Sequence, residues 1–387
     1  MSKRVVCIIL LLAILTGILS LGFYRQQRNI LEASDSFYEK LADGFDVNIL
    51  IVGDSISAGS GASDDVHRWP VMLENYLEET FHVNVLVNNV SLGGNTSYAG
   101  YVRTRNLQDG EIYDLAILCF AQNDSPLQLA FYYEALVRAV QEKCPNSSII
   151  SIKESTLRKE KHIPKVEAIE TVSAYYEIPV ADMVKAYQAS PLSYEELSED
   201  LIHPSDPGQK VYFETISALI EKGVREGRKN PDEGNLDTGD FQDEKEESKS
   251  SAHENGLSSE NKGNAHGFAV KEPMEPSVRI LDSFEYLDAG SFYQRKTLCY
   301  ETDIRDFHGI IGFDYIYGNG NHWAKLFIGG QEYLTIELNE RGQTSQRYIW
   351  VIDEAGSLDG KLEIEFSDEE AAGAFQGLIL SKDTERR

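Results

Sequence analysis

Short runs of β-branched and aliphatic residues alternate with amphipathic stretches between residues 45 and 226, and this alternation constrains the fold more than any other feature. Strand-like runs separated by helix-like stretches are typical of a parallel sheet with helices on both faces. The runs are VNILIV (47–52), VNVLVNN (83–89), YDLAILC (113–119), SIISIK (148–153) and IPVAD (178–182). The pattern predicts a three-layer α/β domain over residues 45–226.

The hydrophobic period changes in the last part of the chain. Residues 227–275 consist mainly of Gly, Ser, Asn, Asp and Glu with few aliphatic residues, a composition that predicts a disordered, charge-extended acidic linker. From residue 276 to 387 the apolar residues alternate with polar ones, in short runs separated by Gly, Asn and Asp turns. This period of two predicts an all-β, sandwich-like domain over 276–387.

The N-terminus has the character of a membrane segment. Residues 5–23 contain no charged side chain and follow Lys3 and Arg4. At about 1.5 Å rise per residue, a helix of this length covers roughly 28 Å, close to the apolar thickness of a bilayer. We interpret residues 1–24 as a single-pass membrane anchor, or alternatively a cleaved signal peptide, and residues 25–44 as a stalk. The remainder of the chain is expected outside the cell, attached to the cell membrane or secreted.

Charge and cysteine content exclude several classes of function. The chain has 36 Lys and Arg against 63 Asp and Glu, a formal net charge of −27, which argues against nucleic-acid binding. The four cysteines are widely spaced, and neither a C-x-x-C pair nor an H-E-x-x-H motif occurs, so the sequence gives no support for a zinc site.

Three short motifs follow the first three strand runs. GDS (53–55) follows the first run, NVSLGGNTS (89–97) overlaps the end of the second, and FAQND (120–124) follows the third. A serine at the carboxyl end of a parallel strand lies where such sheets bind ligands. Glycine lets a backbone N–H approach a substrate oxygen, and an asparagine amide can donate to a developing oxyanion. Each motif alone is also compatible with an ordinary turn or helix cap.

A fourth motif, EDLIHP (199–204), precedes the last helical stretch. The spacing of Asp200 and His203 lets the carboxylate reach Nδ1–H of the imidazole, which leaves Nε2 free to act as a base. With these four motifs in this order, residues 45–226 resemble the SGNH (GDSL) hydrolase family, whose four blocks supply a serine, a glycine, an asparagine and a histidine. The matching residues are Ser55, Gly94, Asn123 and His203.

The match has one supporting feature and one departure. Trp69-Pro70, shortly after the first block, also matches a recurrent packing feature of the family. The third block of the family usually begins with glycine, whereas Ala121-Gln122 precede Asn123 in this chain. Gly93 is a neighbouring alternative to Gly94 in the second block.

The resemblance implies a flavodoxin-like parallel sheet and a serine-hydrolase mechanism. Ser55 would attack an ester carbonyl, His203 would accept the serine proton, and Asp200 would orient the imidazole. The N–H groups of Ser55 and Gly94 and the side-chain amide of Asn123 would form the oxyanion hole. This mechanism requires no metal and no cofactor.

We therefore expect a cell-surface serine esterase that removes O-acyl groups, in particular O-acetyl, from a polysaccharide or wall glycan. One alternative is a lysophospholipase or thioesterase of the same family, since NVSLGGNTS is similar to the second block of that branch. Another is a non-catalytic surface protein that binds glycans. The β-rich domain carries aromatic residues that either fill its core or stack on sugar rings, and GNGNHW (318–323) is the candidate binding loop. These residues are Tyr315, Tyr317, Trp323, Tyr333 and Trp350.

Overall fold

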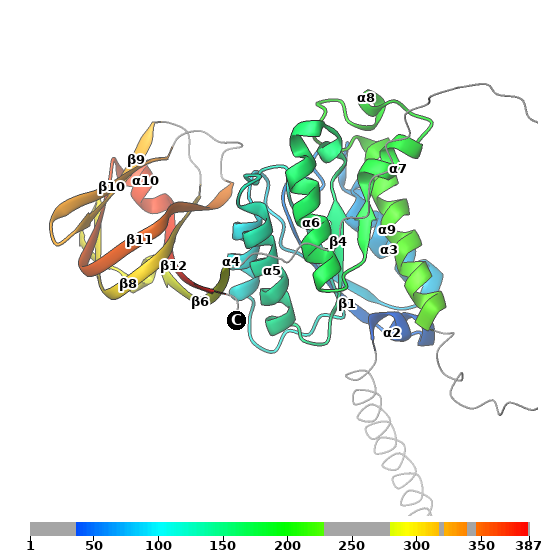
Figure 1. Cartoon of the computed structure of the whole chain (residues 1–387), viewed down its shortest axis with the longest axis horizontal. Coiled ribbons are helices and arrows are strands. Elements are labelled where there is room, and N and C mark those ends of the chain that lie inside the picture. Colours follow the sequence, from blue (N-terminus) through cyan, green and yellow to red (C-terminus); the bar gives the residue numbers. More distant parts are fainter. Residues whose placement is uncertain (1–35, 228–278, 317–320, 339–345, 386–387) are drawn as a thin grey trace, which may run out of the picture.

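The computed structural model describes residues 36–227, 279–316, 321–338 and 346–385, which form an α/β domain and a β domain lying side by side (Figure 1). The predicted membrane segment, most of the predicted stalk and nearly all of the predicted linker lie outside these ranges. Within the part of the chain that the structure describes, no helix combines the length and the apolar character needed to cross a membrane.

A parallel five-stranded sheet forms the middle layer of the α/β domain. Its spatial order is β2-β1-β3-β4-β5, the strand order of flavodoxin-like sheets, as the sequence predicts. The strands are β1 (Val47–Gly53), β2 (Val85–Asn89), β3 (Leu115–Cys119), β4 (Ser148–Lys153) and β5 (Val180–Asp182).

Helices cover both faces of this sheet, which explains why its strands read as continuous apolar runs. Along β1, Ile49 and Ile51 enter one core and Leu50 and Val52 enter the other. The first core lies under α2 (Phe37–Asp43), α3 (Trp69–Phe81), α7 (Met183–Ala189), α8 (Tyr194–Leu197) and α9 (Asp206–Gly227). The second lies under α4 (Ser97–Arg105), α5 (Leu129–Lys143) and α6 (Ile163–Tyr175). Short 3₁₀ turns occur at Asp65–His67, Ser155–Arg158 and Glu160–His162.

Residues 36–43 correct the predicted extent of the stalk. Ser36 caps helix α2 in a reciprocal capping box with Glu39. Phe37 and Leu41 are buried in the first core, and Lys40 forms a 2.8 Å ion pair with Asp114. The sequence shows polar helical character here, but burial of these two side chains makes the segment part of the α/β domain.

The β domain consists of one antiparallel seven-stranded sheet that folds over on itself. Its spatial order is β10-β9-β11-β8-β12-β6, with β7 paired to β8. The strands are β6 (Arg279–Asp288), β7 (Tyr293–Lys296), β8 (Cys299–Ile316), β9 (His322–Ile328), β10 (Gln331–Leu338), β11 (Arg347–Phe366) and β12 (Phe375–Glu385). A 3₁₀ turn at Ala289–Ser291 and helix α10 (Glu369–Ala374) complete the domain.

Two long strands give the β domain its sandwich-like form. Strands β8 and β11 contain 18 and 20 residues and pair along most of their length. Register shifts interrupt that pairing in the middle of β11, and such bulges bend a strand. The C-terminal end of β11 (residues 362–366) pairs with β9. The C-terminal part of β8 (residues 310–315), at the other end of the β8–β11 pair, pairs with β12. The two halves enclose a core that includes Ile311, Phe313, Leu326 and Ile364.

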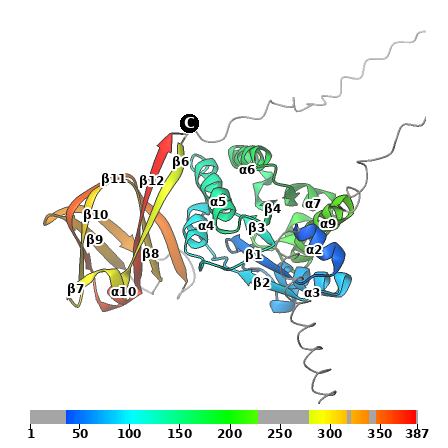
Figure 2. The ribbon, with the colours of Figure 1, turned by 90° about the horizontal axis from the view of Figure 1, so that it is seen from below.

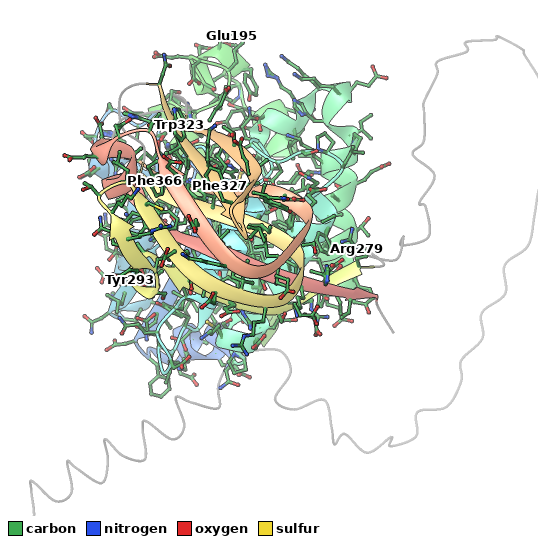
Figure 3. All side chains as sticks on the ribbon, turned by 90° about the vertical axis from the view of Figure 1, so that its left-hand side faces the viewer. Glu195, Arg279, Tyr293, Trp323, Phe327 and Phe366 are labelled. Atoms are coloured by element: carbon green, nitrogen blue, oxygen red, sulfur yellow. The ribbon has the colours of Figure 1, made fainter. Side chains whose placement is uncertain are left out.

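Several aromatic residues singled out in the sequence belong to this core. Tyr315 is buried, and Tyr333 and Trp350 pack against the same cluster. Trp323 lies at the start of β9, on the side of the domain away from the α/β domain (Figure 3), with the Lys325 ammonium 5.3 Å from its ring centre. Tyr317 and residues 318–320, the first half of the GNGNHW loop, lie outside the described residues.

The β domain packs against α4 and α5 of the α/β domain (Figure 2). Leu281, Ile310, Ile349 and Ile379 of the β domain join the apolar cluster that contains Tyr98 of α4. The two domains therefore share a continuous hydrophobic core, which fixes the start of β11 beside the loops at the carboxyl ends of the parallel strands.

Candidate active site

Ser55 lies in the tight turn that follows β1. The turn is closed by the Ser60 N–H, which donates to the carbonyl oxygen of Ser55 at 2.9 Å. Trp69 is buried at the start of α3, and its indole N–H donates to the carbonyl oxygen of Ile56 at 3.2 Å. Trp69 thus supports the turn that carries the serine, which gives the Trp69-Pro70 motif a physical role.

The structure brings together the three residues that the sequence assigns to catalysis. Nε2 of His203 lies 2.9 Å from Oγ of Ser55, and Nδ1 of the same ring lies 2.6 Å from Oδ2 of Asp200. Gly61 permits this approach, because a Cβ on it would lie 2.9 Å from Cβ of His203, and its φ of +91° favours glycine. The alcohol, imidazole and carboxylate form a continuous hydrogen-bonded chain, although Ser55 and His203 are far apart in the sequence.

Asp200 is held by its own turn. Its Oδ1 accepts the backbone N–H groups of Ile202 and His203 at 2.9 and 2.7 Å. Partial burial acts to raise the pKa of Asp200, but these bonds and the bond to the His203 ring outweigh it and hold the pKa below its usual value. The carboxylate therefore stays ionised near neutral pH, as a group that orients an imidazole and stabilises its cation must.

The predicted oxyanion donors surround the same space. Ser55, Gly94 and Asn123 all line one cavity, and Gly93 lines it as well. Gly94 has a φ of +70°, and a Cβ on it would lie 2.8 Å from the ring of Tyr348, so both conformation and contact favour glycine.

Asn123 is fixed by two acceptors within the protein. Its Nδ2 donates to Oδ2 of Asp54 and to the carbonyl oxygen of Asn95, both at 3.1 Å. Because both N–H groups are engaged, an oxyanion can accept from this amide only by sharing one of the two protons or by replacing one of the two acceptors. The amide is rigidly held, and its use as a donor requires this exchange.

A cluster of buried charged residues lies behind the catalytic turn. Burial raises the pKa of Asp54 to about 7 and that of Asp124 to about 6. Burial, together with these two carboxyl groups, also raises the pKa of Glu154. Lys165 lies beside them. The sequence analysis does not predict this cluster, although Asp54 and Asp124 belong to the motifs GDS and FAQND and Glu154 directly follows β4.

The cavity over Ser55 has a volume of about 500 Å³, and residues of both domains form its walls. Gln346 and Tyr348 of the β domain line it, and the sequence contains no pattern that predicts this. The α/β domain contributes Ser55, Ser60, Gly61, Gly93, Gly94, Gln122, Asn123, Glu199, Asp200, Ile202, His203 and Ser205.

Asn95 joins the oxyanion loop to the β domain. Its Nδ2 donates to the carbonyl oxygens of Arg347 and Gly93 at 3.0 and 2.9 Å, and its Oδ1 accepts the N–H of Ile349 at 3.0 Å. The asparagine side chain therefore pairs with the backbone of β11 much as a neighbouring strand would. Residue 95 lies within the motif NVSLGGNTS, but its partner in the β domain is not evident from the sequence.

This arrangement can perform nucleophilic acyl transfer. His203 can accept the proton of Ser55 as the serine oxygen attacks a carbonyl carbon, and can then deliver that proton to the departing oxygen. N–H donors of Ser55, Gly94 and Asn123, which line the cavity, are the candidates to stabilise the negative charge that develops on the carbonyl oxygen. Water then repeats the same steps on the acyl-enzyme, so the site defines a serine hydrolase on a flavodoxin-like sheet.

Comparison with known proteins identifies the family. Residues 51–211 match the model of the GDSL-like Lipase/Acylhydrolase family. The α/β domain belongs to this family, and the protein is one of its carboxylic ester hydrolases. A comparison with curated proteins gives no match.

The fold of both domains has a counterpart among solved structures. A two-domain esterase (CEX) active on acetylated mannans is 17% identical to this chain, covers 90% of it with 94% of its own length, and gives a TM-score of 0.60. The same esterase co-crystallised with mannopentaose gives 16% identity, coverages of 93% and 96%, and a TM-score of 0.58. TesA is 20% identical over 46% of this chain and 99% of its own, with a TM-score of 0.40. At such identities the likeness to CEX concerns the fold.

Proposed function

We propose that this enzyme removes O-acyl groups, in particular O-acetyl groups, from carbohydrate outside the cell. The lining of the cavity carries the proposal. Of the side chains around Ser55, almost all are polar or are glycines, and Ile202 is the only aliphatic residue among those that form its described walls. A long acyl chain gains binding energy by burying its methylene groups against apolar walls. Apart from Ile202 and the ring of Tyr348, the described lining has no large apolar side chain against which a long acyl chain could pack, whereas a short acyl group on a sugar needs none.

The space around the cavity also suits a bulky, hydroxyl-rich alcohol. A second hollow of about 520 Å³ lies between the two domains and shares Asn123 with the first. Its lining includes the aromatic side chains of Tyr132 and Trp350 and the carboxylates of Asp353 and Glu354. Aromatic faces and carboxylates are groups that contact sugar rings and hydroxyls. The likeness in fold to an esterase active on acetylated mannans also supports a carbohydrate ester as the substrate.

The proposal includes a location at the cell surface. It is supported by the uncharged stretch at residues 5–23, whose length matches a bilayer, and by the strongly acidic remainder of the chain. The enzyme is then attached by a single membrane-spanning segment, or secreted if that segment is cleaved.

The two alternatives differ in what they require of the cavity. A lysophospholipase or thioesterase needs an apolar channel for a long acyl chain, and the polar walls around Ser55 do not favour that reading. A non-catalytic glycan-binding protein needs no hydrogen-bonded chain from Ser55 to Asp200, which this protein has.

Acyl-chain profiling of the full-length enzyme tests the proposal. Acetate release from acetylated mannan oligosaccharides and wall glycan fragments is measured beside hydrolysis of p-nitrophenyl acetate, octanoate and a lysophospholipid, with Ser55→Ala as the control. We expect kcat/KM for acetyl esters to exceed that for octanoyl esters at least about tenfold, because the extra methylene groups find no apolar wall. A preference for octanoate or lysophospholipid would overturn the carbohydrate assignment and leave the esterase chemistry intact.

A further inference from the structure

The backbone before Asn123 adopts a conformation that favours glycine. Ala121 is fully buried and has a φ of +152°. Side chains with a Cβ rarely occupy this region, and holding one there costs on the order of 1–3 kcal/mol. The strain lies two residues before the amide predicted to contact the oxyanion, at the position where this chain departs from the glycine usual in its family.

Two buried side chains hold the peptide unit that follows Ala121. Nζ of Lys165, on α6, donates to the carbonyl oxygen of Ala121 at 2.7 Å and to that of Gln122 at 3.1 Å. The N–H of Gln122 donates to Oε2 of Glu154 at 2.8 Å. The Ala121 carbonyl and the Gln122 N–H belong to the same peptide group. Both of its polar ends are therefore fixed, one by a lysine and one by a carboxyl group.

The burial of Lys165 makes this arrangement costly. Lys165 is 5% exposed, and burial lowers its pKa, although the nearby carboxyl groups of Asp124 and Glu154 act in the opposite direction. Buried ammonium groups are usually paired directly with a carboxylate. Here the ammonium donates to two backbone carbonyls, so the lysine acts directly on the conformation of the loop.

We propose that Lys165 is a positioning residue, which holds the Ala121–Gln122 peptide in its strained orientation and thereby fixes the position of the Asn123 amide, the proposed oxyanion donor. The lysine replaces the conformational freedom that a glycine at residue 121 would provide. The proposal depends on the esterase mechanism and on the role of Asn123, but not on the identity of the sugar or acyl group.

The first test compares Lys165→Met with Lys161→Met in the full chain. Lys161 is exposed on the turn before α6, so this control removes the same charge from the surface. With p-nitrophenyl acetate, and with active sites counted by fluorophosphonate labelling, we expect Lys165→Met to lower kcat about 10- to 100-fold with KM changed less than about threefold. The control should keep its kcat. An unchanged kcat per active site in Lys165→Met, whatever its melting temperature, would overturn the proposal, because a structural role alone lowers only the number of active molecules.

The second test uses Ala121→Gly, which removes the strain. Glycine adopts this φ readily, so the loop should depend less on the lysine. We expect Ala121→Gly/Lys165→Met to recover most of the kcat lost in Lys165→Met. If Lys165→Met does not fold, recovery of a folded, active protein in the double variant supports the proposal. A double variant that is no better than Lys165→Met, in folding or in kcat, contradicts it.

A third comparison separates this proposal from the role of Asn123. Asn123→Ala alone should lower kcat about 10²- to 10³-fold. Because Lys165 is proposed to act through Asn123, adding Lys165→Met to Asn123→Ala should cause little further loss. If the losses of kcat in the two single variants multiply in the double variant, Lys165 acts by a route that does not involve Asn123. If Asn123→Ala keeps full activity, Asn123 is not an oxyanion donor and the positioning proposal fails with it, while the Ser55 mechanism stands.

Discussion

Replacing Asn95 by alanine tests whether the β domain stabilises the oxyanion loop. The change removes three hydrogen bonds of 2.9–3.0 Å, two of which join the loop to the backbone of β11. It leaves the N–H of Ile349, a buried residue, without its acceptor. An unsatisfied buried donor costs about 1–3 kcal/mol, so we expect the free energy of unfolding to fall by about 2–3 kcal/mol.

The same substitution should also slow catalysis, because the carbonyl oxygen of Asn95 is one of the two acceptors that hold the Asn123 amide. Urea unfolding gives the stability, and kcat per labelled active site on p-nitrophenyl acetate gives the chemistry. The matched control is Asn84→Ala, an exposed asparagine whose amide donates to Oδ2 of Asp46 at 3.1 Å, where we expect a change below about 0.5 kcal/mol and an unchanged kcat. If Asn95→Ala matches the wild type in both urea midpoint and kcat, the loop does not depend on β11 and the reasoning is wrong.

Three further predictions concern the catalytic chain and the buried carboxyl groups. Ser55→Ala should abolish p-nitrophenyl ester hydrolysis, by at least about 10⁴-fold, with an unchanged circular dichroism spectrum; residual turnover near that of the wild type would exclude Ser55 as nucleophile. Asp200→Asn should lower kcat about 10²- to 10⁴-fold, because an asparagine neither fixes the His203 tautomer nor stabilises the imidazolium; an unchanged kcat would argue against this role for Asp200. Burial raises the pKa of Asp54 to about 7, so between about pH 4 and 7 the folded state keeps a proton that the unfolded state has lost. The contribution of Asp54 to the free energy of unfolding should therefore fall as pH rises, by up to about 1.4 kcal/mol per pH unit. Urea unfolding of the wild type and of Asp54→Asn over this pH range measures this contribution as the difference between the two proteins. An equal dependence of the free energy of unfolding on pH in both proteins would contradict the prediction.

The sequence predicts the α/β domain well because its signals are local. Every strand of the parallel sheet overlaps one of the predicted apolar runs, and only Gly53 of β1 lies outside its run, since strands buried on both faces are mostly apolar. Ser55 follows strand β1, whereas Asp200 and His203 belong to a motif before the last helix, and the resemblance to the SGNH family relates these distant motifs to one another. The structure places Nε2 of His203 2.9 Å from Oγ of Ser55, the arrangement that this resemblance implies.

The parts that the sequence does not predict depend on contacts between distant segments. Helix α2 reads as polar stalk, because only its packing against the sheet shows that Phe37 and Leu41 are core residues. The bent strands β8 and β11 read as several short strands, because their bulges interrupt the alternation of apolar residues. The positions of Gln346 and Tyr348 in the cavity follow from the docking of one domain on another, for which the chain contains no local pattern.

The Asn123 amide is held both by contacts within the α/β domain and, through Asn95, by the β domain. One of its N–H groups is held by Asp54, which belongs to the core of the α/β domain, and the other by Asn95, whose side chain is bonded to β11. Oxyanion stabilisation depends on donors that are already oriented before the charge develops. If Asn123 is such a donor, its orientation depends on the docked β domain, and a disturbance at the interface reaches the reacting carbonyl through Asn95. In that case mutations at the start of β11 should alter kcat more than KM for a small ester that is too short to reach the second hollow.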